Sequence, residues 1–290
     1  MQMDDKGVGM QAEEVDNDGA PRASVAQRSN GITYHGGPVM AGKVNVYFIW
    51  YGDWNGGPAA SDSPMTVTLL NSLYANNALG GSGFAQIAST YTDKYRRTAS
   101  SNFALVQSTS DDYSRGKKLT DAAVAGVVSS AIQSGRLPKD SNGIYFVLTS
   151  SDVDETSGFC KKYCGWHDHK NILGSDLKIS FIGNPDRCAD SCEIQSTSPN
   201  GNPGADAMAS IMAHETLETV TDPNLNAWYD AQGQEVGDKC AWMFGPVKGT
   251  LGNGAYNQSM GGHHWLIQMN WVNANGGGCA QTKTGKFYNQ

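Results

Sequence analysis

The sequence predicts an α+β (mixed α/β) fold that forms a single domain over residues 31–290. Segments rich in β-branched and aromatic residues alternate with amphipathic segments that begin at helix-capping residues, which is typical of a central sheet covered by helices. The chain has 290 residues, 39% of them hydrophobic, enough for one substantial core. Its six cysteines all lie in the C-terminal half, so we expect disulfides to brace that half.

The N-terminal residues 1–30 are polar, with few apolar side chains and no periodicity, so we expect a disordered tail. This tail lacks the basic start and apolar stretch of a signal peptide. Secretion would therefore require a leader that is absent from the numbered chain. Order is expected to begin near Ile32.

The first predicted strand covers residues 44–50, whose β-branched and aromatic side chains suit a buried strand. Ser63 and Pro64 are then typical of a helix N-cap followed by the first helical position. We expect this helix to run to about Asn76. The side chains expected to face inward are Val67, Leu70 and Leu73.

Four further elements complete the predicted N-terminal half. A Gly-rich turn precedes a short helix at 84–91, and a strand is expected at 103–106. A longer helix should begin at Thr120 and end near Gly135, because Gly is a good C-cap. Residues 143–149 form the clearest predicted strand.

The C-terminal half is expected to contain more loop. Residues 158–192 are predicted to be dominated by loops around one strand at 178–182. A long helix is expected at 204–220, followed by Gly-rich loops at 245–262 and a last strand at 264–272.

Charge and hydropathy exclude two classes of partner. The formal net charge is −7, from 21 basic and 28 acidic residues, and no basic patch of the kind that binds nucleic acid stands out. No apolar run approaches the roughly 18 residues that span a bilayer. We expect a monomer that binds neither nucleic acid nor a membrane.

The cysteines indicate an oxidising compartment, and hence a secreted, extracellular protein. Four of them form two Cys-x-x-x-Cys pairs. Spacing alone does not fix the pairing. We favour cross-linking the two pairs to each other and joining the last two cysteines. The six residues are Cys160, Cys164, Cys188, Cys192, Cys240 and Cys279. The alternative is a zinc site built from Cys160, Cys164, His167 and His169, whose spacing matches no common zinc module.

The predicted helix at 204–220 contains His214, Glu215 and Glu218. Residues four apart lie on one face of a helix, so His214 and Glu218 can bind one ion. Glu215 lies about 100° round the helix, beside the ion, where it can act as general base. The pattern is similar to the His-Glu-x-x-His helix of zinc peptidases, with Glu218 replacing the second His. A carboxylate suits zinc but also calcium or manganese.

A catalytic zinc needs a third protein ligand. We prefer Asp238, then Glu235, then Asp222, with the pair His263 and His264 as further candidates. Tyr229 is a candidate to stabilise an oxyanion opposite the ion. The alternative is that His-Glu-x-x-Glu is a chance match in a solvated helix end. The apolar residues before His214 argue against an exposed helix.

Other candidate residues have plainer interpretations. His35 is expected to be structural or at the surface. His167 and His169 could hold a second ion, but we expect them to be local features of a braced loop. Aromatic side chains around the first strand could line a carbohydrate or peptide cleft, although core packing is favoured; they are Trp50, Tyr51 and Trp54. No Gly-x-Ser-x-Gly elbow of a serine hydrolase is present.

Several motifs occur in an order that resembles one known family. They are Tyr34-His35-Gly36-Gly37-Pro38-Val39, Ile49-Trp50-Tyr51-Gly52, Leu148-Thr149-Ser150-Ser151-Asp152-Val153, Phe159-Cys160, Cys164-Gly165, Ser198-Pro199-Asn200-Gly201, Ala213-His214-Glu215, Asn226-Ala227-Trp228-Tyr229, Glu235, Asp238, Cys240 and Leu266-Ile267-Gln268. Over residues 32–280 the chain resembles the EXORDIUM, or phosphate-induced protein, family of secreted plant cell-wall proteins.

The resemblance implies secretion to the apoplast or cell surface and a link to growth and to carbon or phosphate responses, but it assigns no chemistry. The family pattern has Asn in place of Asp222, which weighs against Asp222 as a ligand and indirectly favours Asp238 and Glu235. The looser Gly-rich loops favour a microbial member. A zincin-like fold is implied by the His214 helix, by analogy.

Two functions compete at this point. The first is a secreted zinc metallopeptidase that acts on a peptide or protein, in which Glu215 takes the proton of the attacking water. The second is a non-catalytic cell-wall or signalling protein that binds a wall component and holds a structural ion. A carbohydrate hydrolase would need a separate pair of carboxylates, and the sequence offers none beyond the metal candidates.

Overall fold

The computed structural model describes residues 7–8, 31–250, 253–274 and 276–288. The predicted disordered tail falls almost wholly outside these residues. At Gly7–Val8 the structure differs from that prediction, because these two residues form strand β1 against the edge of the main sheet.

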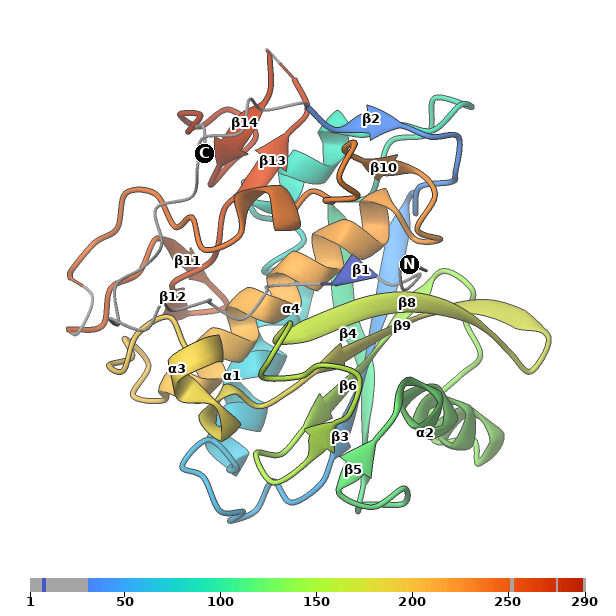
Figure 1. Cartoon of the computed structure of the whole chain (residues 1–290), viewed down its shortest axis with the longest axis vertical. Coiled ribbons are helices and arrows are strands. Elements are labelled where there is room, and N and C mark those ends of the chain that lie inside the picture. The colour runs from blue at the N-terminus through green and yellow to red at the C-terminus, as the bar shows by residue number, and fades with distance from the viewer. Residues whose placement is uncertain (1–6, 9–30, 251–252, 275, 289–290) are drawn as a thin grey trace.

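The central sheet has six strands in the order β1-β8-β9-β6-β3-β4 (Figure 1). Four are parallel to one another, while β8 runs antiparallel to β9 and β1 antiparallel to β8. Their bounds are β3 Lys43–Tyr51, β4 Asn102–Asp111, β6 Gly143–Thr149, β8 Gly165–Ile172 and β9 Ser175–Ile182. The mixed α/β architecture with a central sheet is therefore confirmed.

Helices cover both faces of this sheet (Figure 1). Helices α1 (Pro64–Tyr74) and α4 (Pro203–Thr221) lie on one face, and α2 (Asp121–Gln133) lies on the other. All seven residues of β6 are buried as a result. Strands with both faces covered become nearly continuous apolar runs, which explains why this strand was the clearest in the sequence.

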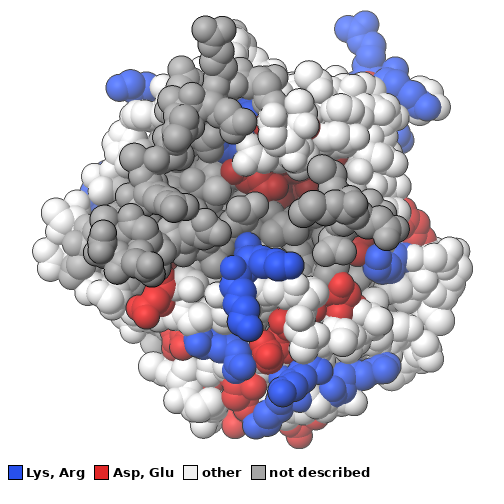
Figure 2. Space-filling model, viewed as in Figure 1, with Lys and Arg blue, Asp and Glu red and all other residues white. Residues whose placement is uncertain are grey.

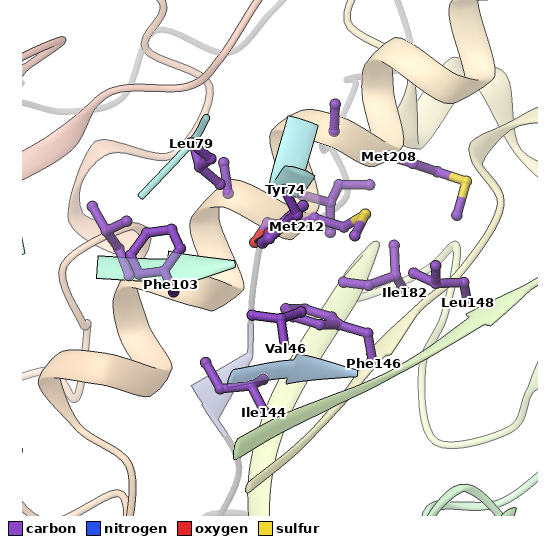
Figure 3. Packing of buried hydrophobic residues seen from close by; sticks show 14 of the residues in the cluster. Val46, Tyr74, Leu79, Phe103, Ile144, Phe146, Leu148, Ile182, Met208 and Met212 are labelled. Atoms are coloured by element: carbon purple, nitrogen blue, oxygen red, sulfur yellow. Dashed lines mark hydrogen bonds between the residues drawn. The ribbon is translucent and has the colours of Figure 1, made fainter. Parts of the chain in front are cut away.

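The core between α4 and the sheet consists of large apolar side chains. Figure 3 shows Met208 and Met212 of α4 directed towards Phe146 of β6 and Ile182 of β9. Gly165 at the start of β8 lets α4 approach the sheet closely, since a Cβ there would lie 2.6 Å from a methyl of Ile211. The predicted buried helix therefore packs closely against β8.

Helix α4 is buried from Gly204 to Thr221, and the sequence explains how such a helix is tolerated. Asn202 accepts a hydrogen bond from the backbone N–H of Ala205 and so caps the N-terminus. The hydroxyls of Thr216 and Thr219 donate to the carbonyls four residues earlier, so burial leaves them satisfied. Other buried polar side chains of the helix outside the site are hydrogen-bonded too; they are Asp206, Ser210 and Thr221.

Several boundaries agree with the predictions. Strands β3 and β6 and helix α2 match closely, and Thr120 caps α2 as expected. Helix α1 buries Leu70 and Leu73, while Val67 is only partly buried. Strand β4 extends well beyond the predicted 103–106.

Three predictions need correction. Residues 158–192 are not dominated by loops, because β8 and β9 form an eight-residue antiparallel hairpin. The helix predicted at 84–91 is the 3-10 segment η2 (Ala85–Thr90). The strand predicted at 264–272 is divided into β12 (His263–Trp265) and β13 (Asn270–Val272), which pair with different partners.

The remaining elements are short and lie mostly in the C-terminal half. Pairs of short strands form small two-stranded sheets, and short helical turns connect the larger elements. These elements are β2 Thr33–Tyr34, β5 Lys118–Leu119, β7 Asp154–Glu155, β10 Trp228–Tyr229, β11 Gln258–Met260, β14 Gly278–Ala280, η1 Ala75–Asn77, η3 Pro185–Arg187, α3 Ala189–Cys192 and η4 Asp238–Cys240.

Three disulfides brace the C-terminal half, as expected. They join Cys160 to Cys188, Cys164 to Cys192 and Cys240 to Cys279. The two Cys-x-x-x-Cys pairs are thus cross-linked to each other, and the alternative zinc site through Cys160 and Cys164 is excluded. The third bridge ties η4 to β14, next to the candidate metal site.

Basic and acidic side chains intermingle on the face shown in Figure 2. This distribution agrees with the absence of a basic patch in the sequence. In the part of the chain that the structure describes, no helix is both long and apolar enough to cross a membrane.

Candidate metal centre

Three elements bring six ionisable side chains together at the middle of α4. The helix supplies His214, Glu215 and Glu218; β8 supplies His167; and the segment that ends in η4 supplies Glu235 and Asp238. All six are buried, and the most exposed of them, Asp238, has a relative exposure of 8%.

The first set of possible ligands is the predicted one: His214, Glu218 and Asp238. Nε2 of His214 lies 3.0 Å from Oε1 of Glu218 and 3.5 Å from Oδ1 of Asp238. Ligands about 2.0–2.1 Å from a tetrahedral zinc ion lie about 3.3 Å apart. The spacing of these atoms therefore fits a zinc site, and the preferred third ligand is the one that the fold brings to the helix.

Neighbouring groups hold this set in place. The backbone N–H groups of Gly237 and Asp238 donate to Oε1 of Glu218 at 3.1 and 3.0 Å, which ties η4 to α4. The side-chain amide of Gln268 lies 2.9 Å from Nδ1 of His214, so that Nε2 faces the carboxylates. Such outer contacts orient a histidine ligand.

His167 is the site residue that sequence reasoning did not connect with α4, although a second ion at His167 and His169 was one of its alternatives. It was assigned to a braced loop, but it lies on β8 and its Nε2 is 3.1 Å from Glu235 and 3.7 Å from Glu218. Its neighbour His169 is partly exposed and pairs with Asp176. If residues 165–172 had been recognised as a strand, the two histidines would not have been grouped with the cysteine motif. That strand alone would still not have shown that His167 lies close to α4.

Burial raises the pKa of three carboxyl groups in the cluster. It raises the pKa of Glu215 well above its usual value, and Glu218 adds to this while His214 opposes it. Burial and Glu218 also raise the pKa of Glu235 well above its usual range. Burial raises the pKa of Asp238 to about 6, and Glu218 again contributes. Full ionisation of these groups therefore requires a cation among them.

Glu218 and His214 behave differently from the other groups. Burial alone would raise the pKa of Glu218, but His214, His167 and the Asp238 amide bring it below its usual value. Burial alone would lower the pKa of His214, yet Glu218 and Asp238 raise it well above its usual value. A proton on His214 thus occupies the position between two carboxylates that a metal ion would take.

Several buried polar atoms of the cluster have no hydrogen-bond partner within the described part of the chain. They are both oxygens of Glu215, Oε2 of Glu218, Oε1 of Glu235, Oδ1 of Asp238 and Nε2 of His214. A buried polar atom without a partner costs about 1–3 kcal/mol, and a charged one costs more. This concentration of unpartnered donors and acceptors is what a cation-binding site requires.

The structure places the other candidates elsewhere. Asp222 caps the turn after α4, because its carboxylate accepts hydrogen bonds from the backbone N–H groups of Asn226, Ala227 and Trp228. Its role there is structural. The exposed His264 of β12 stacks on Tyr256, and neither His264 nor His263 belongs to the two ligand sets described for this chain.

Tyr229 lies on β10, where its ring stacks on His35 with 3.7 Å between centroids. Nε2 of His35 also lies 3.1 Å from the carbonyl of Tyr229. His35 thus has the structural role expected of it. The proposed role of Tyr229 in stabilising an oxyanion stays a prediction.

A separate polar pocket of about 680 Å³ lies at the carboxyl ends of β3, β4 and β6. Tyr113, Lys117 and Asp152 line it, and Lys117 pairs with Asp152 at 2.6 Å. Trp50 and Trp54 are buried and pack edge to face, so core packing explains these aromatic residues better than a sugar-binding cleft.

Residues 32–273 match the family described as the phosphate-induced protein 1 conserved region. Protein EXORDIUM-like 5 of Arabidopsis thaliana is 30% identical over 83% of this chain and 75% of its own length. Protein EXORDIUM-like 3 of the same plant is 31% identical over 80% and 74%, respectively. Protein PHOSPHATE-INDUCED 1 of Nicotiana tabacum is 30% identical over 69% and 68%. No solved structure matches the chain significantly.

Proposed function

The chain belongs to the phosphate-induced protein 1 family, and from that premise and the geometry of its metal centre we propose that it is a secreted metal-dependent hydrolase. Its ion is zinc, and its substrate is a peptide or protein, or a peptide component of the cell wall. Three disulfides and the EXORDIUM-type relatives support an extracellular location.

One observation carries the proposal. Glu215 lies next to the His214–Glu218–Asp238 set, and both of its carboxylate oxygens are buried without a partner in the described part of the chain. A carboxylate in a purely structural site would be expected to accept hydrogen bonds. Glu215 is instead free to take a proton from a water molecule beside the ion.

The geometry leads to a proposed role for each residue of the site. Zinc in such a site polarises a carbonyl and lowers the pKa of water to about 7. His214, Glu218 and Asp238 hold the ion, and Glu215 accepts the proton of the water and passes it to the leaving amine. Gln268 positions His214. One imidazole with two carboxylates also suits manganese, or calcium in a site completed by further oxygens.

The arrangement of α4 beside an antiparallel strand of the sheet supports a zincin-like assignment of the fold. Strand β8 lies at the helix, and its backbone runs opposite to the neighbouring β9. Tyr229 is the proposed oxyanion-stabilising residue. Tyr229→Phe is expected to lower kcat about 100-fold with little change in KM; unchanged kcat would remove Tyr229 from the mechanism.

The test of the proposal is Glu215→Gln in the full chain loaded with zinc. Peptide hydrolysis is followed by mass spectrometry on a mixed peptide library, and zinc is measured after desalting. We expect activity to fall at least about 100-fold while the ion at His214, Glu218 and Asp238 stays bound. Glu193→Gln, in a half-buried residue outside the site, serves as the matched control. Full activity of Glu215→Gln would disprove the mechanism.

A second candidate function is favoured by the burial of the site. His214, Glu215 and Glu218 are fully buried, as expected of an ion that staples α4 to η4 in a non-catalytic binding protein. Zinc bound at full occupancy, with no product from any peptide and a lower melting temperature after chelation, would support this candidate against the hydrolase.

A further inference from the structure

The metal centre contains a second set of possible ligands, in which the proposed function gives no role to His167. His167, Glu215 and Glu218 offer ligand atoms that all lie within 4.8 Å of one another. His167 comes from β8 and approaches Oε2 of Glu218, whereas His214 approaches Oε1, and the two imidazoles fall in different sets. The cluster is therefore larger than one zinc ion with three ligands requires.

The spacing in this second set resembles that in the first. Nε2 of His167 lies 3.1 Å from Oε2 of Glu235 and 3.7 Å from Oε2 of Glu218. These values bracket the roughly 3.3 Å expected between ligands of a tetrahedral ion. Glu235 lies beside the set of His167, Glu215 and Glu218 through its contact with His167, and so offers a further carboxylate.

Glu218 belongs to both sets through different oxygens. Oε1 lies 3.0 Å from His214, whereas Oε2 points to His167 and has no hydrogen-bond partner within the described residues. Two hydrogen bonds from the backbone of η4 fix the orientation of this carboxylate. A carboxylate held in this way can bridge two ions, with one oxygen on each.

The charges of the cluster also match two divalent cations. Glu215, Glu218, Glu235 and Asp238 contribute four negative charges when ionised, and neutral imidazoles contribute none. One divalent ion would leave two buried carboxylates uncompensated, which is costly. Two such ions balance the four carboxylates. In the described part of the chain no lysine or arginine is paired with any of the four.

We propose that the protein holds a second divalent transition-metal ion, bound by His167, Glu215, Glu235 and Glu218, with Glu218 bridging it to the first ion. The inference rests on the proposed function for the first ion and deepens it. Glu215 gives one oxygen to the second ion and keeps the other for the proton of the attacking water. Two-metal sites of this kind serve hydrolases that clamp the attacking and departing groups together.

The test counts the ions in the full chain, with Mn²⁺ and Zn²⁺ as probes. Metal-free protein is titrated calorimetrically, and metal content is measured after desalting. The wild type should bind two ions per chain, and His167→Asn and Asp238→Asn should each bind one. His169→Asn, two residues along the same strand in a partly exposed position, should keep two. Binding of one ion by the wild type overturns the proposal, as does an unchanged count in His167→Asn.

Electron paramagnetic resonance of the Mn²⁺-loaded protein gives a readout that a merely structural His167 would not change. A carboxylate-bridged pair should give an exchange-coupled spectrum in the wild type and an isolated-ion spectrum in His167→Asn. Far-ultraviolet circular dichroism checks folding of each variant. If His167→Asn does not fold, the wild-type count and spectrum still decide, because isolated ions in a saturated wild type contradict a bridge.

The two proposals fail in different ways. Two ions without hydrolysis of any peptide would leave the metal centre standing and remove the hydrolase. Hydrolysis that depends on Glu215, with one ion per chain, would keep the hydrolase and remove the second ion. Loss of the second ion in His167→Asn should lower activity without releasing the ion held by His214.

Discussion

The residues around His214 are packed so closely that small changes in side-chain size should alter the affinity for the proposed ion. Gly237 has an ordinary negative φ, yet a Cβ at this position would lie 2.6 Å from the imidazole of His214. The glycine is thus required by contact with the ligand ring and not by backbone strain. Its N–H also donates to Glu218, so the same residue supports two ligands.

Gly237→Ala is therefore expected to displace the His214 ring or η4 by a few tenths of an ångström or more. Zinc affinity should fall about 10–100-fold, as it does when groups that orient a ligand are lost. Calorimetric titration measures this change. Gly83→Ala is the control, since its Cβ would contact only a surface threonine side chain at 3.1 Å. Equal affinity in the two variants would contradict the packing argument.

A second residue-scale prediction concerns Glu193, which lies outside the metal centre. Burial raises its pKa from 4.5 to about 8, and the hydrogen bond with Asp186 adds to this. The folded state therefore binds the proton more tightly than the unfolded state. The resulting stabilisation is complete below about pH 4.5 and is lost as the pH rises through about 8.

Glu193→Gln cannot ionise and should remove this dependence. Between pH 5 and 9 the free energy of unfolding of the wild type should fall by about 1–2 kcal/mol relative to the variant, after allowance for the partial exposure of the group. Urea unfolding at the two pH values measures the difference. A constant gap between the two proteins would contradict the assignment.

Sequence reasoning selected the candidate ligands on α4 and in the 235–238 segment, which lie together in the structure, but it did not connect β8 with them. His214, Glu215 and Glu218 are related by helix periodicity, which is visible in any sequence. Asp238 could be ranked because Cys240 anchors its segment. His167 meets Glu218 across 51 residues of chain, through strand pairing that no local pattern encodes.

At the scale of elements, the metal centre depends on how η4 is held. The Cys240–Cys279 bridge begins two residues after Asp238 and closes a loop of 39 residues. Replacing both cysteines by serine is expected to cost about 2–4 kcal/mol of stability. It should also weaken zinc binding, because η4 would no longer be fixed against β14. Denaturant unfolding and zinc titration measure the two effects.

The Cys160–Cys188 bridge provides the matched control for this prediction. It encloses a similar length of chain, with a sequence separation of 28, but it braces the loop around α3 instead of η4. Replacing it with two serines should cost stability without changing the affinity of the ion bound by Asp238. Equal loss of affinity in both double variants would show that general destabilisation, not η4, is responsible.

The edge of the sheet gives another prediction. Gly7 pairs with His167 and Val8 with Trp166, so β1 covers the strand that supplies the second imidazole. A variant that lacks residues 1–30 should expose the outer edge of β8. We expect faster hydrogen exchange at backbone amides of β8, measured by mass spectrometry, while β6 in the middle of the sheet keeps its protection. Unchanged exchange in β8 would contradict the pairing.

The elements that were predicted well are those whose sequence carries their own periodicity. β3, β6, α2 and α4 have long apolar or amphipathic patterns with clear caps. The strand predicted at 178–182 lies within β9, whereas β8 was missed because its glycine and charged residues, next to the first cysteine pair, resemble a loop. These two strands are stabilised by pairing with each other and by packing on α4, so tertiary contacts override local propensity.

For the molecule as a whole, the alternation of elements was enough to predict a mixed α/β domain with a central sheet, but not that helices cover both faces of the sheet. The strand order was not predictable, because β8 lies between β1 and β9 and runs antiparallel to both, which the alternation of strands and helices does not indicate. That departure matters most for the candidate site, since the reversed strand β8 brings His167 to α4. Family membership and cysteine content both agree with a braced extracellular domain.

The coupling of metal binding to global stability provides the last prediction. The cluster joins α4, β8 and η4, so ions that bind the folded chain should stabilise all three elements together. At a free zinc concentration about 100 times the dissociation constant, one ion adds about 2.7 kcal/mol to the free energy of unfolding, which corresponds to a rise in melting temperature of about 5–10 °C.

Once the sites are saturated, each tenfold increase in zinc concentration adds about 1.4 kcal/mol per ion to the free energy of unfolding, and hence about 2.7 kcal/mol for two ions. Calorimetric melting curves over a range of zinc concentrations give this slope, and chelation should return the melting temperature to the metal-free value. In Asp238→Asn the slope should be halved. If the melting temperature of the wild type does not change with zinc concentration, the negative charge of the cluster is neutralised by bound protons and not by metal ions.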